Sequence, residues 1–322
     1  CVVVMETKTG HIKAISNLGR ANDGSYYETQ NYAITESHEP GSTFKLVDLI
    51  AVLDDKKADT SKIYDSKGGV IEYYGRKVRD SKPGGYGKIS LARGFELSSN
   101  TVLVQSVYAN YKNNPKQFVD RINSYGLNKP LGLPIKGEGK PVIPQPGTNR
   151  WSGVALPWMA FGYGLSVTPL QTLTLYNAVA NDGVMVKPIF VSEIKEWNKT
   201  IKKYNTEVIN PKICSQETLD KVQAVLENVV KRGTGSKLYS KDFSMAGKTG
   251  TAQVNYKDKS KLYYASSFVG YFPADEPKYS CIIVVHKPNV AAGYYGADVA
   301  GPVFKRIAQK IFTDSPSTNH VK

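Results

Sequence analysis

Cysteine and histidine are scarce in this chain, and neither residue type forms a recognisable site. The cysteines are Cys1, Cys214 and Cys281. The histidines are His11, His38, His286 and His320. The odd number of cysteines and the scattered histidines match neither a disulfide framework nor the ligand spacing of a zinc site. The sequence therefore predicts no metal centre, and Cys281, within the apolar run YSCIIVVH, is expected to pack as a small hydrophobic residue.

Long hydrophobic runs are also missing. No apolar stretch approaches the roughly 20 residues that a membrane-spanning helix needs, and the first residues lack the pattern of a secretory signal. The chain opens on CVVVMETKTGHIKAIS, a strand-like pattern without an initiating methionine. We therefore expect the first residue to be a cut at a domain edge, with any anchoring or exporting segment outside this chain.

Acidic residues are outnumbered: 42 lysines and arginines stand against 28 aspartates and glutamates, for a formal net charge of +14. Such a balance favours an anionic partner such as nucleic acid, an anionic membrane or a wall polymer, but a lysine-rich soluble surface explains it equally well. No helix-turn-helix, zinc-finger or RNP-like string is present, so we do not predict nucleic-acid binding.

The order of the expected elements indicates an α+β fold. Residues 2–16 read as a strand hairpin, and the late runs GKTGTAQVNY, SSFVGYFPA and YSCIIVVHKP read as further antiparallel strands. Helices are predicted over residues 42–55, 90–97, 101–112, 115–126, 168–181, 216–232 and 298–312. Strands at both ends of the chain predict an antiparallel sheet that pairs the first hairpin with the late strands.

We predict one domain over residues 1–313. Its sheet part comprises residues 1–41 and 236–313, its mainly helical part comprises residues 42–235, and residues 314–322 form a flexible polar tail.

The most informative pair is Ser42 and Lys45, which follow Pro40 and Gly41 at the start of a predicted buried helix. A serine hydroxyl is a weak nucleophile until a nearby base takes its proton, and helix residues three apart lie within side-chain reach. In a desolvated site the ammonium form of a lysine is disfavoured, so its neutral amine can act as that base.

Two further strings carry polar groups suited to the same chemistry. Ser98-Ser99-Asn100 lies between two predicted helices, and Lys248-Thr249-Gly250-Thr251 begins a late strand. Each of the three motifs also has a second copy in an unsuitable context. The second copies are Ser192 to Lys195 in a solvated edge, Ser317-Thr318-Asn319 in the tail and Lys8-Thr9-Gly10 in a hairpin turn.

Other readings of these strings fail. A phosphate-binding loop ending in Gly247-Lys248-Thr249 needs a glycine five residues earlier, and Asp242 stands there. The Gly-x-Ser-x-Gly string of α/β-hydrolases is absent.

Ser-x-x-Lys, Ser-x-Asn and Lys-Thr-Gly in this order are the signature of penicillin-binding proteins and class A β-lactamases. With GYGLSVTPLQ at 162–171 and SFVGYFP at 267–273, the chain resembles the transpeptidase domain of a class B penicillin-binding protein. NYAITESHEPGSTFK and GYGLSVTPLQ resemble the division-specific (septal) branch. Ser99 stands where class A β-lactamases usually carry aspartate, which favours a penicillin-binding protein.

The resemblance implies a penicillin-binding protein/β-lactamase-like transpeptidase fold and a serine-type D-Ala-D-Ala transpeptidase. Ser42 would attack the carbonyl between the two terminal D-alanines of a peptidoglycan stem peptide, with Lys45 as base. The backbone N–H groups of Ser42 and Thr251 would form the oxyanion hole. β-Lactams would acylate the same serine, and no cofactor is required.

The resemblance also assigns the remaining motif residues. Ser98 would relay a proton to the leaving amine, Lys248 would keep that relay electropositive, and Asn100 would orient Lys45 and the substrate amide. The hydroxyls of Thr249 and Thr251, with Lys248, would bind the terminal carboxylate of the substrate. Gly250 would allow close approach of the backbone.

By the same resemblance, the protein would act on the extracytoplasmic face of the bacterial inner membrane, in septal wall synthesis. An N-terminal segment outside this chain would anchor it and contact membrane-embedded division proteins and a glycosyltransferase. Three alternatives stay open: a D,D-carboxypeptidase or β-lactamase-type hydrolase, a β-lactam sensor, and a basic wall- or nucleic-acid-binding module. The last leaves the three motifs unexplained.

Overall fold

The computed structural model describes residues 1–256, 258 and 260–314. The predicted tail, apart from Asp314, and the second Ser-x-Asn copy at Ser317 lie outside the described residues.

The strands are β1 (Val2–Glu6), β2 (Ile12–Ser16), β3 (Leu18–Arg20), β4 (Tyr26–Glu28), β5 (Ile63–Asp65), β6 (Val70–Tyr73), β7 (Arg76–Arg79), β8 (Lys88–Ser90), β9 (Met185–Val186), β10 (Glu193–Glu196), β11 (Lys199–Lys203), β12 (Val208–Asn210), β13 (Ala246–Val254), β14 (Tyr263–Phe272) and β15 (Tyr279–His286). The helices are α1 (Tyr32–Thr35), α2 (Lys45–Asp54), α3 (Leu91–Glu96), α4 (Asn100–Tyr111), α5 (Pro115–Ser124), α6 (Ala155–Met159), α7 (Pro169–Ala180), α8 (Gln216–Arg232), α9 (Gly296–Val299) and α10 (Gly301–Asp314), with 3₁₀ turns η1 (Gly41–Phe44), η2 (Lys67–Gly69), η3 (Ser236–Leu238) and η4 (Val290–Ala292).

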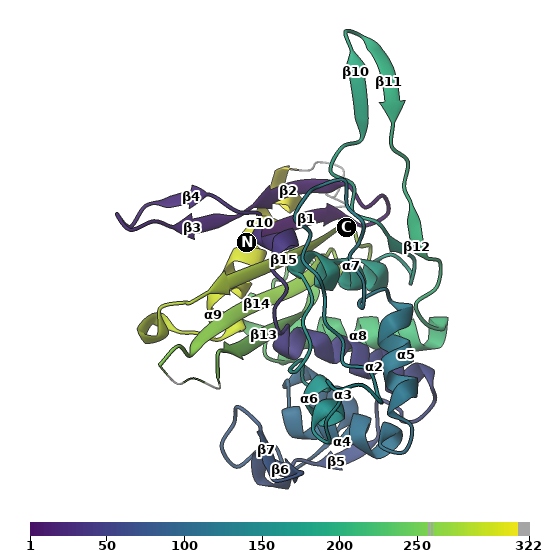
Figure 1. The fold of residues 1–322 in the computed structure, drawn as a ribbon, viewed down its shortest axis with the longest axis vertical. Helices are drawn as coiled ribbons and strands as arrows, with labels where there is room; N and C mark the ends of the chain where they lie inside the picture. Colours follow the sequence, from purple (N-terminus) through teal and green to yellow (C-terminus); the bar gives the residue numbers. More distant parts are fainter. Residues whose placement is uncertain (257, 259, 315–322) are drawn as a thin grey trace.

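A five-stranded antiparallel sheet in the order β13-β14-β15-β1-β2 forms the centre of the molecule (Figure 1). The first hairpin joins the late strands through β1 and β15, where Val2 lies opposite Ile283. The predicted pairing of the two ends of the chain is therefore confirmed. Because β13 stands at one edge of this sheet, its outer side is open to other groups.

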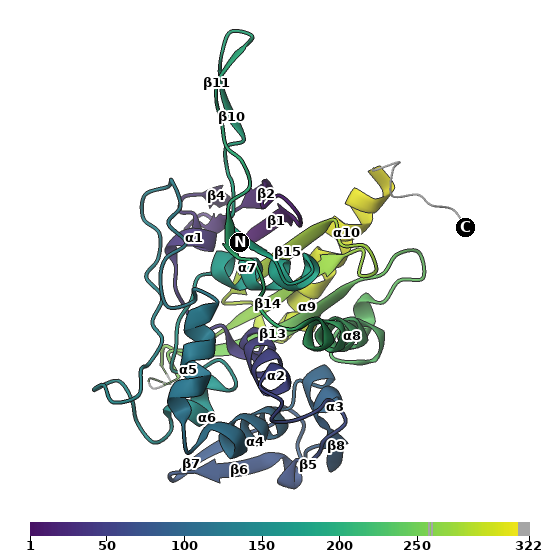
Figure 2. The same ribbon diagram turned by 90° about the vertical axis from the view of Figure 1, so that its right-hand side faces the viewer.

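Alternating residues of the central strands enter two separate hydrophobic clusters. Val3 and Ile282 pack in the cluster that includes α2 and α7, whereas Val4 and Ile283 pack in the cluster that includes Phe304 of α10. This is the alternation of a strand with both faces covered. Figure 2 shows the arrangement from the side, with α7 and α8 on one face of the sheet and α10 on the other.

Helices α3, α4 and α6 and the short strands β5 to β7 gather at one end of the molecule, below α2 in Figure 1, and α5 lies beside α2. Helices α7 and α8 fall within the range predicted as the mainly helical part, yet they contact β15 and β13 of the sheet. The division into a sheet part and a helical part stays a prediction.

Two predicted helices begin differently in the structure. The helix expected over residues 42–55 starts as the 3₁₀ turn η1 before α2. The helix expected over residues 298–312 is divided at Ala300 into α9 and α10. Pro302 has no N–H to continue the hydrogen bonds of α9, so it starts a new helix instead. In the described residues, no helix is long and apolar enough to cross a membrane.

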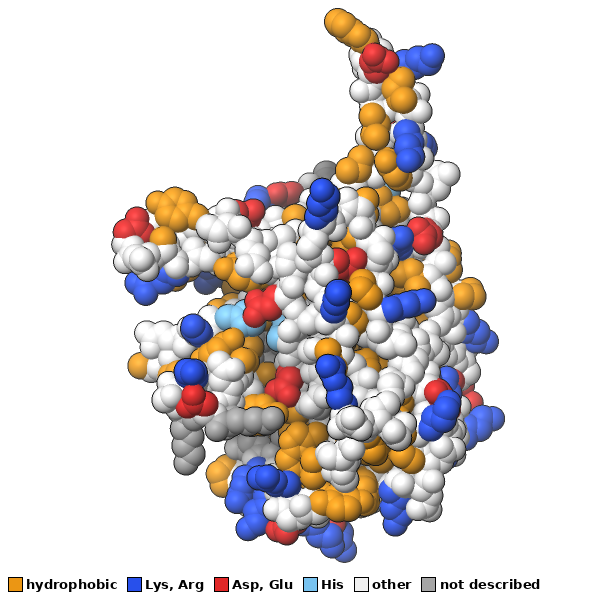
Figure 3. All heavy atoms as spheres, in the orientation of Figure 1, with side chains coloured by type: hydrophobic (Ala, Val, Ile, Leu, Met, Phe, Trp, Pro, Cys, Tyr) orange, Lys and Arg blue, Asp and Glu red, His pale blue; other side chains and the backbone are white. Residues whose placement is uncertain are grey.

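The second Ser-x-x-Lys copy runs from Ser192, directly before β10, to Lys195 within β10. The hairpin of β10 and β11 projects away from the sheet (Figures 1 and 3). Every residue of both strands is exposed, and Trp197 at the tip is 95% exposed. The predicted solvated edge for Ser192 and Lys195 is confirmed.

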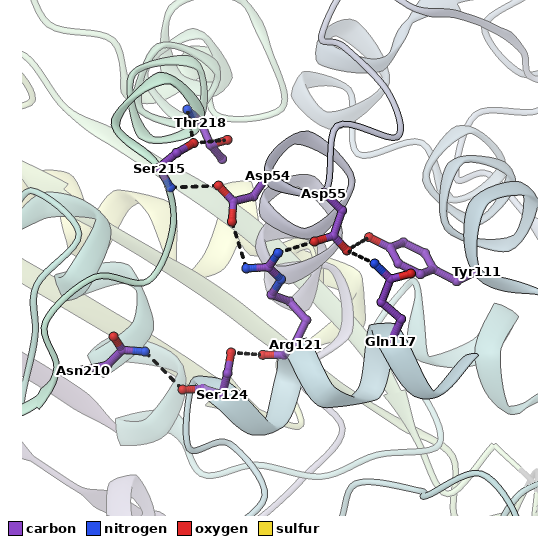
Figure 4. A network of polar contacts seen from close by, with 9 residues as sticks. All are labelled: Asp54, Asp55, Tyr111, Gln117, Arg121, Ser124, Asn210, Ser215 and Thr218. Carbon is purple, nitrogen blue, oxygen red and sulfur yellow. Dashed lines mark hydrogen bonds and ion pairs between the residues drawn. The ribbon is translucent and has the colours of Figure 1, made fainter. Parts of the chain in front are cut away.

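A polar network joins α2, α5 and the start of α8 (Figure 4). Arg121 of α5 donates to Asp54 at 2.8 Å and also pairs with Asp55. Asp54 accepts from the backbone N–H of Ser215, the N-cap of α8, and Asp55 accepts from Tyr111. Both carboxylates are mostly buried, with side chains 13% and 8% exposed. Arg121 therefore ties the helix that carries Lys45 to α5, and the same two carboxylates tie it to α8 and α4.

Replacing Arg121 with methionine should lower the free energy of unfolding by about 3 kcal/mol, because it leaves two poorly solvated carboxylates without their cation. Urea unfolding of both proteins measures the change. Lys116→Met on the same helix is the matched control, because Lys116 and Asp120 form an exposed pair. That control should change stability by less than about 1 kcal/mol. Equal losses in the two variants would contradict the role given to Arg121.

Candidate active site

The turn that carries Ser42 is pressed against the edge strand β13. Gly41 has a φ of +57°, and a Cβ added to it would lie 3.1 Å from the Cβ of Ala252. Its N–H also donates to Gly162 O at 3.1 Å. Only glycine adopts this backbone conformation without strain in so narrow a space. Ser42 is half-buried, whereas its neighbours Gly41 and Thr43 are buried.

Lys45, the first residue of α2, is fully buried and reaches across to the turn between α3 and α4. Its Nζ donates to Ser98 O at 2.7 Å, to Asn100 Oδ1 at 2.6 Å and to Ser98 Oγ at 3.3 Å. Asn100 therefore contacts Lys45 directly, and its role in orienting Lys45 and the substrate amide stays a prediction. Folding thus brings Lys45 into contact with Ser98 and Asn100, which lie 53 and 55 positions further along the chain.

Lys248 approaches the same hydroxyl from the sheet. Its Nζ donates to Ser98 Oγ at 2.8 Å and to Thr249 O at 3.0 Å, and it lies 5.6 Å from the centre of the Phe95 ring. Ser98 Oγ therefore accepts from two lysines at once, and its own proton is left to donate elsewhere.

The Ser42 hydroxyl forms no hydrogen bond with Lys45 or with the other described residues. Lys45 nevertheless follows Ser42 by one 3₁₀ turn, in which the backbone N–H of Lys45 donates to Ser42 O. Catalytic hydrogen bonds are often long before substrate binds and tighten only in the complex. The structure thus places Ser42 beside the lysine pair, with its hydroxyl free to meet a substrate.

Burial governs the charge of both lysines. It lowers the pKa of Lys45 to about 7, while the negative charges of Asp80 and Asp48 oppose this shift. Burial and the neighbouring charge of Lys45 also lower the pKa of Lys248 well below its ordinary value. A lysine amine with a pKa near neutrality is able to accept a proton.

The Ser98-Ser99-Asn100 turn holds an unusual backbone conformation. Ser98 has a φ of +57°, in the left-handed region that few residues other than glycine adopt. Ser99 then caps α4 by accepting from the N–H of Val102 at 3.2 Å. Strained residues of this kind persist only where the surroundings hold them, and they cluster at functional sites.

The three residues after Lys248 lie along β13. Thr249 Oγ1 is 2.7 Å from Thr234 Oγ1, and Thr251 Oγ1 accepts from the N–H of Gly296 at 3.0 Å. A Cβ added to Gly250 would lie 2.9 Å from Thr43 Cγ2 in the neighbouring turn. Gly250 thus allows the close approach of this turn to β13. Its predicted role toward the substrate stays a prediction.

The backbone N–H groups of Ser42 and Thr251 were predicted to form the oxyanion hole. The contact of Gly41 with Ala252 brings the two segments together at the open edge of β13. Their joint role as donors stays a prediction.

Asp80, Asp48 and Thr234 take part in this site, and the sequence analysis missed all three. Thr234 follows α8 between two glycines, which is the only local signal for it. Asp48 lies three residues after Lys45, one helical turn further along α2, and this spacing could have shown it. Asp80 ends the string KVRD in a hairpin-rich region, and no nearby motif distinguishes it.

The donors gathered here are amines, hydroxyls and an amide. Within the part of the chain that the structure describes, no group of three or more His, Cys, Asp or Glu side chains lies together in a way that could hold a metal ion. A depression of about 530 Å³ lies elsewhere, between α8 and α10, and its lining contains none of the motif residues.

The sequence model of the penicillin binding protein transpeptidase domain matches residues 1–309. The chain belongs to this family. Among its curated relatives, stage V sporulation protein D from Bacillus subtilis is 30% identical over 95% of this chain and 48% of its own length. The peptidoglycan D,D-transpeptidase FtsI from Escherichia coli K12 is 27% identical over 95% of this chain and 50% of its own length.

Solved structures of the family agree with this fold. Penicillin-binding protein 3 from Mycobacterium tuberculosis, in complex with aztreonam, is 27% identical and superposes with a TM-score of 0.82 over 97% of this chain and 72% of that chain. The transpeptidase domain of a peptidoglycan glycosyltransferase from Eggerthella lenta gives 26% identity and a TM-score of 0.82 over 96% of this chain and 78% of that chain. The predicted family and α+β transpeptidase fold are confirmed. The chain spans about half the length of the curated relatives it matches.

Proposed function

We propose that this domain is a D,D-transpeptidase that crosslinks peptidoglycan stem peptides through an acyl-enzyme on Ser42, in septal wall synthesis. One observation carries the proposal. Two buried lysines, Lys45 and Lys248, converge on the hydroxyl of Ser98 beside the half-buried Ser42. This arrangement would supply a nucleophile, a base whose pKa is lowered to about 7 by burial, and a proton relay within one site.

In the acylation step, Ser42 Oγ attacks the carbonyl carbon between the two terminal D-alanines and gives its proton to Lys45. The oxyanion that forms is stabilised by the backbone N–H groups of Ser42 and Thr251. The C–N bond then breaks as the leaving amine takes a proton from Ser98 Oγ, and Lys45 returns a proton to Ser98. An acceptor amine reverses these proton transfers, forms the crosslink and releases Ser42.

Lys248, Thr249 and Thr251 lie along β13 where the substrate's terminal carboxylate would be bound. Because Thr251 Oγ1 already accepts from Gly296, its own proton remains to be donated. Lys248 adds the positive potential that attracts a carboxylate to this edge of the sheet.

The carboxylates near Lys45 favour a transpeptidase over a β-lactamase. Asp48 is fully buried, and Asp80 already accepts hydrogen bonds from Ser99 and Thr101. Neither offers a free carboxylate that would activate water against the acyl-enzyme, so we expect deacylation to be slow.

Mass spectrometry after incubation with benzylpenicillin tests the proposal. We expect an adduct on Ser42 that persists for many minutes, and we expect a D-Ala-D-Ala peptide with an acceptor amine to give the crosslinked product. Rapid loss of the adduct would indicate a β-lactamase, and hydrolysis of the peptide in place of crosslinking would indicate a carboxypeptidase. A folded protein without any adduct would refute the serine mechanism.

We place this reaction on the extracytoplasmic face of the inner membrane, because peptidoglycan is the proposed substrate. The relatives FtsI and penicillin-binding protein 3 support β-lactams and stem peptides as ligands. The membrane anchor, the division proteins and the glycosyltransferase partner remain proposals drawn from the family resemblance.

A further inference from the structure

Asp80 directly follows β7, and its carboxylate accepts hydrogen bonds from the start of α4. Its Oδ1 accepts from the N–H of Thr101 at 2.9 Å, and its Oδ2 accepts from Thr101 Oγ1 at 2.9 Å. Ser99 Oγ lies 3.1 Å from both carboxylate oxygens. A charged acceptor with several donors is a strong anchor for a backbone turn.

Arg79, the residue before Asp80, also binds this turn. Arg79 O accepts from Asn100 Nδ2 at 2.7 Å, while Asn100 Oδ1 faces Lys45. Residues 79 and 80 therefore fix three consecutive residues, 99 to 101, directly after the strained Ser98. The side-chain amide of Asn100 has a donor, Nδ2, and an acceptor, Oδ1. Because Arg79 O binds Nδ2, Oδ1 is oriented toward Lys45.

Asp80 also provides negative charge to a site with two lysines. The charged and titratable groups near Lys45 are Asp48 of its own helix, Lys248 of β13 and Asp80. Asp48 is fully buried, and neither of its oxygens has a hydrogen-bond partner among the described residues. Burial raises the pKa of Asp48 well above its usual range, and the neighbouring Lys45 opposes this shift. Asp80 is half-buried and accepts hydrogen bonds from Ser99 and Thr101.

We propose that Asp80 is a positioning residue of this acyl-transfer site: it locks the Ser98–Asn100 turn against the two lysines, and its negative charge helps to set the protonation of Lys45. The inference rests on the proposed function and extends it to a residue outside the three motifs. The hairpin of β6 and β7 is thereby part of the support of the reaction centre.

The test compares pH profiles of benzylpenicillin acylation in the wild type, Asp80→Asn and Ser99→Ala. Asp80→Asn keeps one acceptor but removes the charge, so the midpoint of the profile should move to lower pH by about 0.5 to 1 unit. Ser99→Ala loosens the turn and keeps the charge, so the plateau rate should fall about tenfold while the midpoint stays unchanged.

Asp65→Asn is the matched control, because Asp65 belongs to the same group of short strands and its carboxylate accepts from the N–H of Lys67. Neither its midpoint nor its plateau should change. A folded Asp80→Asn with the wild-type profile would overturn the inference, and so would a Ser99→Ala that shifts the midpoint as much as Asp80→Asn.

Thermal unfolding shows whether Asp80→Asn is folded. If it does not fold, Ser99→Ala decides: a reduced plateau supports the inference, and a wild-type plateau overturns it. Failure of the wild type itself to be acylated would refute the proposed function, an outcome distinct from failure of the role of Asp80.

Discussion

Replacing Ser42 with alanine should abolish the benzylpenicillin adduct. Ser42 is half-buried and precedes the buried Lys45 by three residues, and its hydroxyl is the proposed nucleophile. Without it, the remaining groups have no nucleophile to activate, and the acylation rate should fall by about 10⁴-fold or more. Intact-protein mass spectrometry and peptide mapping measure the loss.

The second Ser-x-x-Lys copy provides the control for this variant. Ser192 shares the spacing but lies in an exposed segment next to the projecting hairpin. Ser192→Ala should be acylated at the wild-type rate. An adduct that survives in Ser42→Ala at the same position of the peptide map, or one lost in Ser192→Ala, would show that the nucleophile has been assigned to the wrong serine.

Replacing Lys45 with methionine should slow acylation by about 10²- to 10⁴-fold, the range typical of a lost general base. Methionine fills the buried space and leaves no uncompensated charge, so most of the effect is on the reaction. Ser98 O and Asn100 Oδ1 each lose a donor, at a cost of about 1–3 kcal/mol in stability, which urea unfolding measures separately.

The same residue sets the pH dependence of the wild type. Because burial lowers the pKa of Lys45 to about 7, its neutral, proton-accepting fraction grows as the pH rises through that value. Acylation should therefore increase about tenfold between about pH 6 and about pH 8 and level off above. Stopped-flow kinetics with a chromogenic β-lactam gives the profile.

Lys195→Met on the exposed hairpin is the control for both measurements, and its rate and profile should equal those of the wild type. A Lys45→Met protein that is folded and acylates at the wild-type rate would remove Lys45 from the role of base. A wild-type profile that is flat from about pH 6 to about pH 8 would show that titration of Lys45 does not control the acylation rate.

Local patterns were sufficient for most of the fold. The apolar run YSCIIVVH and its neighbours predicted the late strands, and the helix predicted over residues 216–232 is α8 at its observed limits. The start of α2 and the break at Ala300 were not predicted. The first depends on the contact between Gly41 and β13, and the second on a proline that breaks one helix and starts the next.

The sequence by itself determined the family and the three motifs, because the order of short strings and the context of each copy are local properties of the chain. Only the tertiary structure decided which groups meet: Lys45 and Lys248 at Ser98 Oγ, Thr234 at Thr249, and Asp80 at the first turn of α4. The pKa of Lys45 was likewise beyond the sequence. That pKa depends on burial and on charges that folding brings close, and neither can be read from the residues next to Lys45 in the sequence.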